Sequence, residues 1–446
     1  MPLFVSRLLS SLRMTTRLPT GSITSHLAAF FALDSLTMHL VKLFCYSMRE
    51  PRPRVATAAP YNDPTRYGDS MPANPLQPLH EQAEATFLPY GENVQIVESY
   101  GEVEAEYAAI RKAVALFDCP HRSVVVLTGK DRTGFLQNKL TNDIAKPGVG
   151  SGCYAYMLNL KGRIISDLIV LNGEDATLID LDTRLVKGFV DQMNKYIFTE
   201  DVKVLDAADS LGRLLLTGPR AAELLAKITN APLDNLTENF RHTKRQIGTT
   251  TATIFRQDLC GEPGYELIVP RDRLTPLWQQ IHEVGNGHEN GESLMGLRAI
   301  GWSAFNTARI EAGTPLYGID ITDHYLPLET SHWYTRAVSS TKGCYLGQEI
   351  VARMHVHNTA ARLLVGLRVT GDKLPVAGTD IFDAANPASQ VGMVTSSCLS
   401  PMLGLSPVVL GYVKKPFAQP GREVELLAEG ARTKAKVVEL PFWHKS

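Results

Sequence analysis

The character of the chain changes near residue 358, and this change most constrains the possible folds. Upstream, segments with helical apolar spacing alternate with strand-like segments. Downstream, short strand-like runs are separated by Gly, Pro, Asp and Ser, and helical patterns almost vanish. The predicted downstream strands are residues 363–369, 390–395, 408–413, 423–427 and 433–440. The pattern predicts a separate β domain, a barrel or a sandwich, over residues 358–446.

Residues 79–357 mix predicted antiparallel strands with helices. The predicted strands are residues 123–129, 152–157, 164–171, 214–217 and 264–269, and the predicted helices are residues 102–117, 131–136, 221–228 and 271–284. This mixture indicates an α+β fold. The 446 residues are 44% hydrophobic with a net charge of −1, which is ordinary for a globular chain of two or three domains. The chain has no excess of basic charge, so its composition does not indicate nucleic-acid binding.

The first 78 residues differ from the rest. Residues 1–47 hold four Lys or Arg and one acid among many Ser, Thr and Leu. This composition fits a targeting presequence, which would place the protein in the mitochondrial matrix. It also fits a non-native extension before a true start at Met48 or Met71, which we favour and which implies a bacterial-type cytoplasmic protein. Polar residues interrupt the apolar stretch 27–45, so no membrane span is expected. Seven prolines predict a linker over residues 51–78.

The densest chemistry lies in residues 342–353, which combine one thiol, two glycines, two cations and a carboxylate. Lys342 and Arg353 would lower the pKa of the Cys344 thiol if they meet it in space. The alternative is a glycine-pinned loop carrying a small apolar cysteine. The six cysteines of the chain are scattered, without Cys/His metal spacing, so no metal site is predicted and a reducing compartment is indicated.

Two predicted strands each contain one acid among apolar residues. Asp167 interrupts residues 164–170, and Glu266 interrupts residues 264–269. Because burying an unpaired carboxylate costs several kcal/mol, each acid must be partnered, exposed or kept for a ligand. Tyr154, on the preceding strand, could face the same space as Asp167.

Two further pairs of residues are weaker candidates. Arg309 and Glu311 are two residues apart, so they would not face each other on a helix and each is expected to pair elsewhere. His355 and His357 alternate on an expected strand that follows a polar turn at Gln348 and Glu349. Two histidines are too few for a metal site without distant ligands.

These residues carry a family likeness. The run Lys342-Gly-Cys-Tyr-Leu-Gly-Gln-Glu349, with Arg353, resembles the signature of the YgfZ family of folate-binding proteins. Other segments resemble the wider superfamily of the glycine-cleavage T-protein, an aminomethyltransferase. They are residues 117–118, 128–129, 135–136, 141–143, 261–266, 309–313, 392–397, 400–401 and 440–442. The resemblance implies a ring of sheet and helix domains around a folate-binding hole, with a C-terminal β-barrel.

The resemblance also implies roles for single residues. Asp167 matches an acid that contacts the reactive part of tetrahydrofolate, Tyr154 matches a tyrosine of the same site, and Glu266 matches a pterin-binding glutamate. Arg309 is a further candidate for cofactor binding. Three positions depart from the aminomethyltransferase pattern, namely Ser166, Leu259 and Phe305, the last replacing a folate-contacting arginine.

Two functions follow from the resemblance. The first is a folate-binding, YgfZ-like protein that supports iron–sulfur cluster assembly or repair in client enzymes, including tRNA-modifying ones. Cys344 would be its functional thiol, with Lys342 and Arg353 as electrostatic partners and Asp167 in the catalytic set. The alternative is a tetrahydrofolate-dependent aminomethyltransferase. In either case the expected partners are tetrahydrofolate and, for the first, iron–sulfur client or assembly proteins, with no nucleic acid or membrane and with the chain as a monomer.

Overall fold

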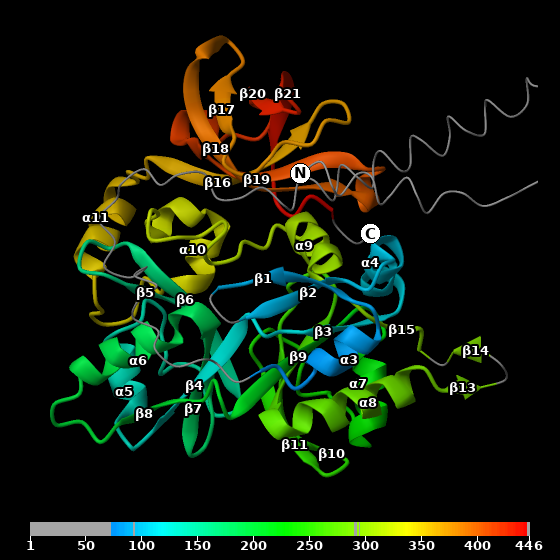
Figure 1. Ribbon diagram of the computed structural model, residues 1–446. Helices are drawn as coiled ribbons and strands as arrows, with labels where there is room; N and C mark the ends of the chain where they lie inside the picture. Colours follow the sequence, from blue (N-terminus) through cyan, green and yellow to red (C-terminus); the bar gives the residue numbers. More distant parts are fainter. Residues whose placement is uncertain (1–72, 92–93, 290–291, 294, 444–446) are drawn as a thin grey trace, which may run out of the picture. The chain divides into compact units, whose positions relative to one another are not determined.

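The computed structural model describes residues 73–91, 94–289, 292–293 and 295–443. Figure 1 shows two groups of sheets and helices joined to a separate group of barrel strands. The presequence and start-site interpretations concern residues 1–47, which lie outside the described residues. No helix in the described part of the chain is long and apolar enough to cross a membrane.

The first sheet has five antiparallel strands in the order β5-β6-β7-β4-β8. Its strands are β4 (Arg122–Thr128), β5 (Ser151–Leu158), β6 (Ile164–Asn172), β7 (Ala176–Asp182) and β8 (Lys203–Asp206). Alternate residues of β6 face opposite sides. Leu168 and Val170 join one apolar cluster with helices α5 (Arg132–Gln137) and α6 (Val186–Lys195). Ile169 and Leu171 face a second cluster on the other side.

The second sheet has six strands in the order β10-β11-β12-β9-β3-β15. Its strands are β3 (Val114–Asp118), β9 (Leu211–Thr217), β10 (His242–Ile247), β11 (Thr250–Arg256), β12 (Gly264–Pro270) and β15 (Leu297–Ala299). Leu267 and Val269 of β12 pack with helices α7 (Ala221–Thr229) and α8 (Leu274–Gly285). Ile268 faces the opposite way and joins the same cluster as Ile169 of the first sheet. The two sheets therefore share one apolar cluster between them.

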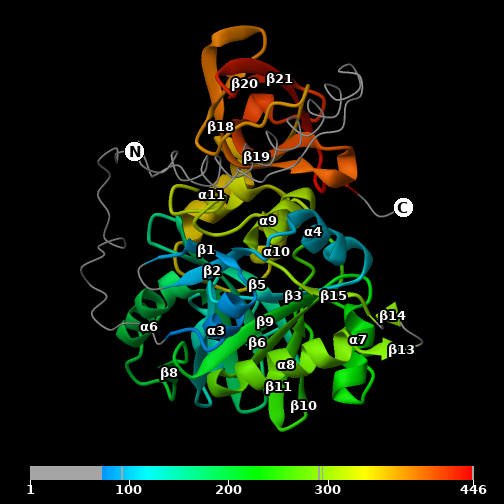
Figure 2. The same cartoon turned by 45° about the vertical axis from the view of Figure 1, so that its right-hand side comes forward.

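Six strands close the C-terminal barrel in the order β16-β19-β18-β17-β20-β21. They are β16 (Arg362–Val369), β17 (Asp380–Asp383), β18 (Asn386–Ser400), β19 (Ser406–Lys414), β20 (Glu423–Ala428) and β21 (Ala431–Val438). Figure 2 shows helix α9 (Trp302–Glu311) beside the barrel strands, and α9 contacts β18 and β19. The predicted α+β fold with a C-terminal β-barrel is confirmed. Among the barrel strands, the short β17 is the one that the sequence analysis did not predict.

The remaining elements are short. They are α3 (Gln77–Gln82), β1 (Thr86–Pro89), β2 (Gln95–Ser99), α4 (Val103–Lys112), α10 (His332–Ala337), α11 (Gln348–His357) and two-residue strands at 288–289 and 292–293. Short 3₁₀ turns lie at Thr183–Leu185, Arg271–Arg273, Pro327–Thr330, Pro401–Leu403 and Lys415–Phe417.

Three local predictions differ from the structure. The helix expected over residues 102–117 stops at Lys112, because the following apolar run enters the sheet as β3, fully buried between β9 and β15. The expected polar turn and strand around residues 348–357 form the single helix α11. The two histidines at its end are therefore two residues apart on a helix and do not share a face. The folded chain also starts within the stretch predicted as linker, since Leu76 is fully buried ahead of α3.

Candidate functional site

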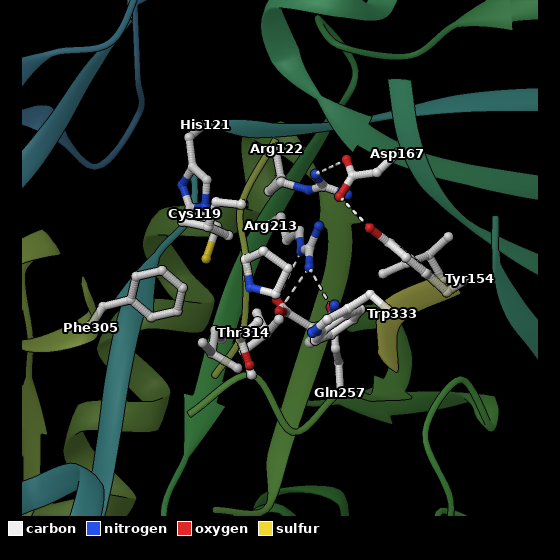
Figure 3. Close-up of a pocket in the computed structure, with 16 residues that line it drawn as sticks. Cys119, His121, Arg122, Tyr154, Asp167, Arg213, Gln257, Phe305, Thr314 and Trp333 are labelled. Atoms are coloured by element: carbon white, nitrogen blue, oxygen red, sulfur yellow. Dashed lines mark hydrogen bonds and ion pairs between the residues drawn. The ribbon is translucent and has the colours of Figure 1, made fainter. Parts of the chain in front are cut away.

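A small cavity of about 40 Å³ lies between the two sheets. Figure 3 shows side chains from both sheets and from the loop after α9 converging on it. Its lining residues are Cys119, His121, Arg122, Tyr154, Asp167, Ile169, Arg213, Leu215, Gln257, Leu259, Glu266, Phe305, Thr314, Pro315, Leu316 and Trp333. The structure therefore brings together Asp167, Tyr154 and Glu266, which the resemblance assigned to one site.

Asp167 is held from two sides. Its face of β6 is the one that turns toward the second sheet, and the residue is only 6% exposed. The Tyr154 hydroxyl donates a hydrogen bond of 2.9 Å to Oδ2, and Arg122 Nη1 lies 3.6 Å from Oδ1. Oδ1 has no hydrogen-bond donor among the described residues. Burial raises the pKa of Asp167, and the Arg122 charge and the Tyr154 hydroxyl oppose that shift. The carboxylate thus presents one oriented oxygen with spare acceptor capacity.

Glu266 is fully buried on β12 and is held by Arg213 on the neighbouring strand β9. Arg213 Nε donates to Oε2 at 2.8 Å, and Nη2 lies 2.7 Å from Oε1. Burial raises the pKa of Glu266, with Arg213 the main opposing influence. Arg213 also contacts Asp180 through Nη1 and Gln257 through Nη2. The pair of Arg213 and Glu266 therefore has one hydrogen bond, at Oε2, while Oε1 lies in ion-pair contact but accepts no hydrogen bond from the described residues.

Asp180 joins the two halves of the site. It is fully buried on β7 and accepts hydrogen bonds from both Arg122 and Arg213. One continuous chain of charges therefore runs from Asp167 to Glu266. It contains three carboxylates and two guanidinium groups, so one negative charge is in excess when all five are ionised. The site favours a ligand that offers hydrogen-bond donors over one that brings an anion into it.

Aromatic side chains form the opposite wall of the cavity. Phe305 of α9 stacks on Phe117 with ring centroids 5.0 Å apart, and Trp302 packs against both Phe305 and His121. Burial lowers the pKa of His121 well below its usual range, and the Arg122 charge adds to this effect. At Phe305 the wall carries no guanidinium, in keeping with the departure noted from the sequence.

Arg309 does not line the cavity, and this corrects its assignment to cofactor binding. Its guanidinium is fully buried and pairs with Asp320 at 2.5 Å. It also donates to Ser396 of the barrel at 2.7 Å. Glu311 pairs with Arg111 at 2.5 Å and accepts a hydrogen bond from Ser400 of the barrel. Both residues pair elsewhere, as their spacing predicted, and they connect α9 to the barrel.

Residues 342–347 of the cysteine motif form the end of the loop between α10 and α11, and none of the motif residues lines the cavity. Cys344 is exposed. Lys342, expected beside the thiol, instead donates to the carbonyl oxygens of Gln137, Leu140 and Asn142 at 2.5–2.7 Å. Burial lowers the pKa of Lys342 to about 8. The lysine therefore anchors the loop to the end of α5.

Two other residues of the motif have different environments. Gly347, with φ of +76°, begins α11, and an added Cβ would lie 2.6 Å from the Asn159 carbonyl oxygen. A glycine is therefore required where the loop meets the β5–β6 turn. Arg353 is exposed on α11. The predicted roles of Cys344 and Arg353 in chemistry remain predictions.

Sequence reasoning missed Arg122, Arg213, Asp180 and His121. A signal for two of them was present, because Arg213 is the one charge in apolar strand β9 and Asp180 is one of two acids, with Asp182, in apolar strand β7. Like Asp167, a charged residue in such a strand needs a buried partner.

Comparison with known families adds evidence over most of the chain. Residues 76–340 match the model described as the GCVT N-terminal domain. Residues 362–444 match the glycine cleavage T-protein C-terminal barrel domain. The boundary between the two matches falls just before β16, where the barrel begins.

Individual relatives point the same way. The aminomethyltransferase of Desulforamulus reducens is 30% identical over 373 residues, covering 83% of this chain and 98% of the relative. That of Caldanaerobacter subterraneus is 27% identical over 379 residues, covering 85% and 97%. The crystal structure of the glycine cleavage system aminomethyltransferase T from Bartonella henselae superposes with a TM-score of 0.74 at 26% identity, covering 84% of this chain and 98% of that one. With both of its domain models matched in order, this chain belongs to the glycine cleavage T-protein family.

Proposed function

We propose that this protein binds tetrahydrofolate between Asp167 and Glu266 and transfers an aminomethyl-derived one-carbon unit to it. The observation that carries the proposal is the Asp167 carboxylate, buried, oriented by Tyr154 and left with one acceptor oxygen without a donor. The relatives named aminomethyltransferase support this function over the iron–sulfur role that the cysteine motif suggested first.

The donor and acceptor pattern of the site suits the folate. The pterin ring carries an amino group beside a ring N–H, and two such donors match the two oxygens of a carboxylate such as Glu266. The flat ring also suits aromatic walls such as Phe305 and Trp333. A second, oriented carboxylate at Asp167 would accept a hydrogen bond from a folate amine. Each acid would therefore accept hydrogen bonds from a different part of the folate: Glu266 from the pterin edge and Asp167 from an amine.

The chemical work assigned to the chain is positioning and electrostatics. Asp167 would hold the folate amine in a fixed orientation and stabilise positive charge that develops there, while Tyr154 keeps the carboxylate in place. Because burial raises the pKa of Asp167, the same group can also hold a proton. The largely closed cavity would keep water away from the reacting atoms.

The test is calorimetric titration with tetrahydrofolate of the wild type and the Asp167→Asn variant. Loss of one charge-assisted hydrogen bond should weaken binding by about tenfold or more. Asp191→Asn, which alters an exposed ion pair on α6, is the matched control and should bind like the wild type. Formation of methylenetetrahydrofolate from an aminomethyl-lipoyl carrier protein would establish the transfer. Equal affinity of the Asp167→Asn variant and the wild type would refute the proposed role.

One observation favours a second candidate, the YgfZ-like support of iron–sulfur enzymes. Cys344 is exposed on a loop that Lys342 anchors, outside the cavity lining, so a partner protein could reach the thiol without displacing folate. Its partners would be iron–sulfur client or assembly proteins. Complementation of a deletion strain by Cys344→Ala decides the matter: full rescue of cluster-dependent enzymes would exclude a role for the thiol.

A further inference from the structure

Arg213 occupies the place on Glu266 that a ligand needs. Its Nε donates a hydrogen bond to Oε2 at 2.8 Å and its Nη2 lies 2.7 Å from Oε1, so the guanidinium covers both oxygens although Oε1 accepts no hydrogen bond from the described residues. A guanidinium edge and the amino and N–H edge of a pterin present the same pair of parallel donors. Arg213 and the folate would therefore compete for Glu266.

The volume of the cavity also indicates that Arg213 must move before a folate can bind. At about 40 Å³ it holds about three water molecules, by the volume that one buried water requires. A two-ring ligand needs considerably more room. Most of the lining belongs to strands and packed aromatic rings, whereas Arg213 reaches the cavity through a long, unbranched side chain. Movement of that side chain would free both the room and the acceptor atoms.

A second cavity offers a place for the displaced guanidinium. It has a volume of about 250 Å³ and shares Cys119, Arg122 and Arg213 with the first, so Arg213 stands in the wall between the two. Asp118 lines this second cavity from the other face of the second sheet, where it accepts a hydrogen bond from Asn74 and contacts His80.

We propose that Arg213 is a gate on the pterin site, pairing with Glu266 while the site is closed and moving into the second cavity when tetrahydrofolate binds. The inference rests on the proposed function and adds a selection rule to it. A ligand with two adjacent N–H donors can replace the hydrogen bond that Oε2 loses and can also satisfy Oε1, which accepts no hydrogen bond from the described residues. Asp180 keeps its bonds from Arg122 during the exchange, so the first sheet need not rearrange.

The gate is tested by tetrahydrofolate titration of the Arg213→Met variant. Without the competing guanidinium, the dissociation constant should fall by about tenfold or more, the scale of one charge-assisted hydrogen bond. Arg256→Met is the matched control, because Arg256 pairs with Asp258 and does not line either cavity. Its affinity should equal that of the wild type. If Arg213→Met fails to fold, Arg213→Gln should shift the affinity in the same direction by a smaller factor.

A second arm tests where the guanidinium goes. Ala208 lines the second cavity, and Ala208→Phe would fill part of it. This substitution should weaken tetrahydrofolate binding when Arg213 is present and have no effect in the Arg213→Met background. Wild type and Arg213→Met binding with equal affinity would overturn the gate and leave the proposed function standing. If neither protein binds tetrahydrofolate, the proposed function fails and the gate fails with it.

Discussion

Replacing Arg309 by methionine tests whether this arginine serves stability or the ligand. Its guanidinium is fully buried and makes four contacts, with Asp320 at 2.5 Å, Ser396 at 2.7 Å, Asn306 at 2.9 Å and the Thr314 carbonyl at 3.1 Å. Removing one partner of a buried ion pair costs about 3–5 kcal/mol because the other charge stays buried.

The structure places the expected loss at the lower end of that range. Asp320 keeps hydrogen bonds from the hydroxyls of Thr395 and Ser396 and from the Leu316 amide after the arginine is gone. We therefore expect Arg309→Met to lower the free energy of unfolding by about 3 kcal/mol. Urea unfolding measures this loss, and hydrogen exchange in α9 and β18 should locate it. Tetrahydrofolate affinity of the folded variant should not change.

The double variant Arg309→Met/Asp320→Leu is the internal control. A well-packed apolar pair often matches the stability of a buried ion pair, so the double variant should regain much of the loss. A loss below about 1 kcal/mol in the single variant would refute the structural role. So would a single variant of normal stability that binds folate weakly, since that result would restore the binding role expected from sequence.

Three further predictions concern other parts of the chain. Burial lowers the pKa of His121 in the folded protein. Below the ordinary histidine pKa of about 6.5 the unfolded chain therefore binds a proton that the folded chain does not, so the free energy of unfolding decreases as pH falls. His121→Phe should flatten this part of the pH profile of unfolding. Gly347→Ala should lower the melting temperature because the new Cβ would meet the Asn159 carbonyl, whereas Gly343→Ala, with nothing within 4 Å, should not. Lys342→Met should raise amide exchange in residues 339–347 without lowering folate affinity, and unchanged exchange would show that the lysine does not hold the loop.

The fold was largely readable from sequence because its periodicity is strong. The strand pattern at residues 164–171 matches β6 closely, and the glycine-separated runs of the barrel match β16, β19, β20 and β21 closely and the middle of β18. The failures lie where tertiary contacts override local preference. Residues 114–117 have helical propensity, yet they complete a sheet between two strands that are distant in sequence. The end of α11 alternates like a strand, but it continues the helix that begins after Gly347.

Only part of the site could be predicted from the sequence. Asp167 and Glu266 stood out as lone charges in apolar strands, and the resemblance supplied their expected roles. Their partners come from other strands, and no local pattern pairs Arg213 with Glu266 or Arg122 with Asp180. Such pairings depend on sheet order and register, which a single sequence does not specify. For Lys342 the motif was informative, but its contacts belong to a segment about 200 residues earlier in the chain.

The contacts between α9 and the barrel bear on how this protein could be divided. Arg309 donates hydrogen bonds to Ser396 of β18 and to the Thr314 carbonyl oxygen, in the loop whose residues 314–316 form one wall of the cavity between the sheets. A fragment ending before β16 would strip Arg309 and Glu311 of their barrel partners and expose the apolar surface that Ile310 buries against Tyr412. The region that matches the N-terminal domain model and the region that matches the barrel model are therefore expected to fold and evolve as one unit. Expressing either region alone, or exchanging it with that of a relative, should disturb the ligand site.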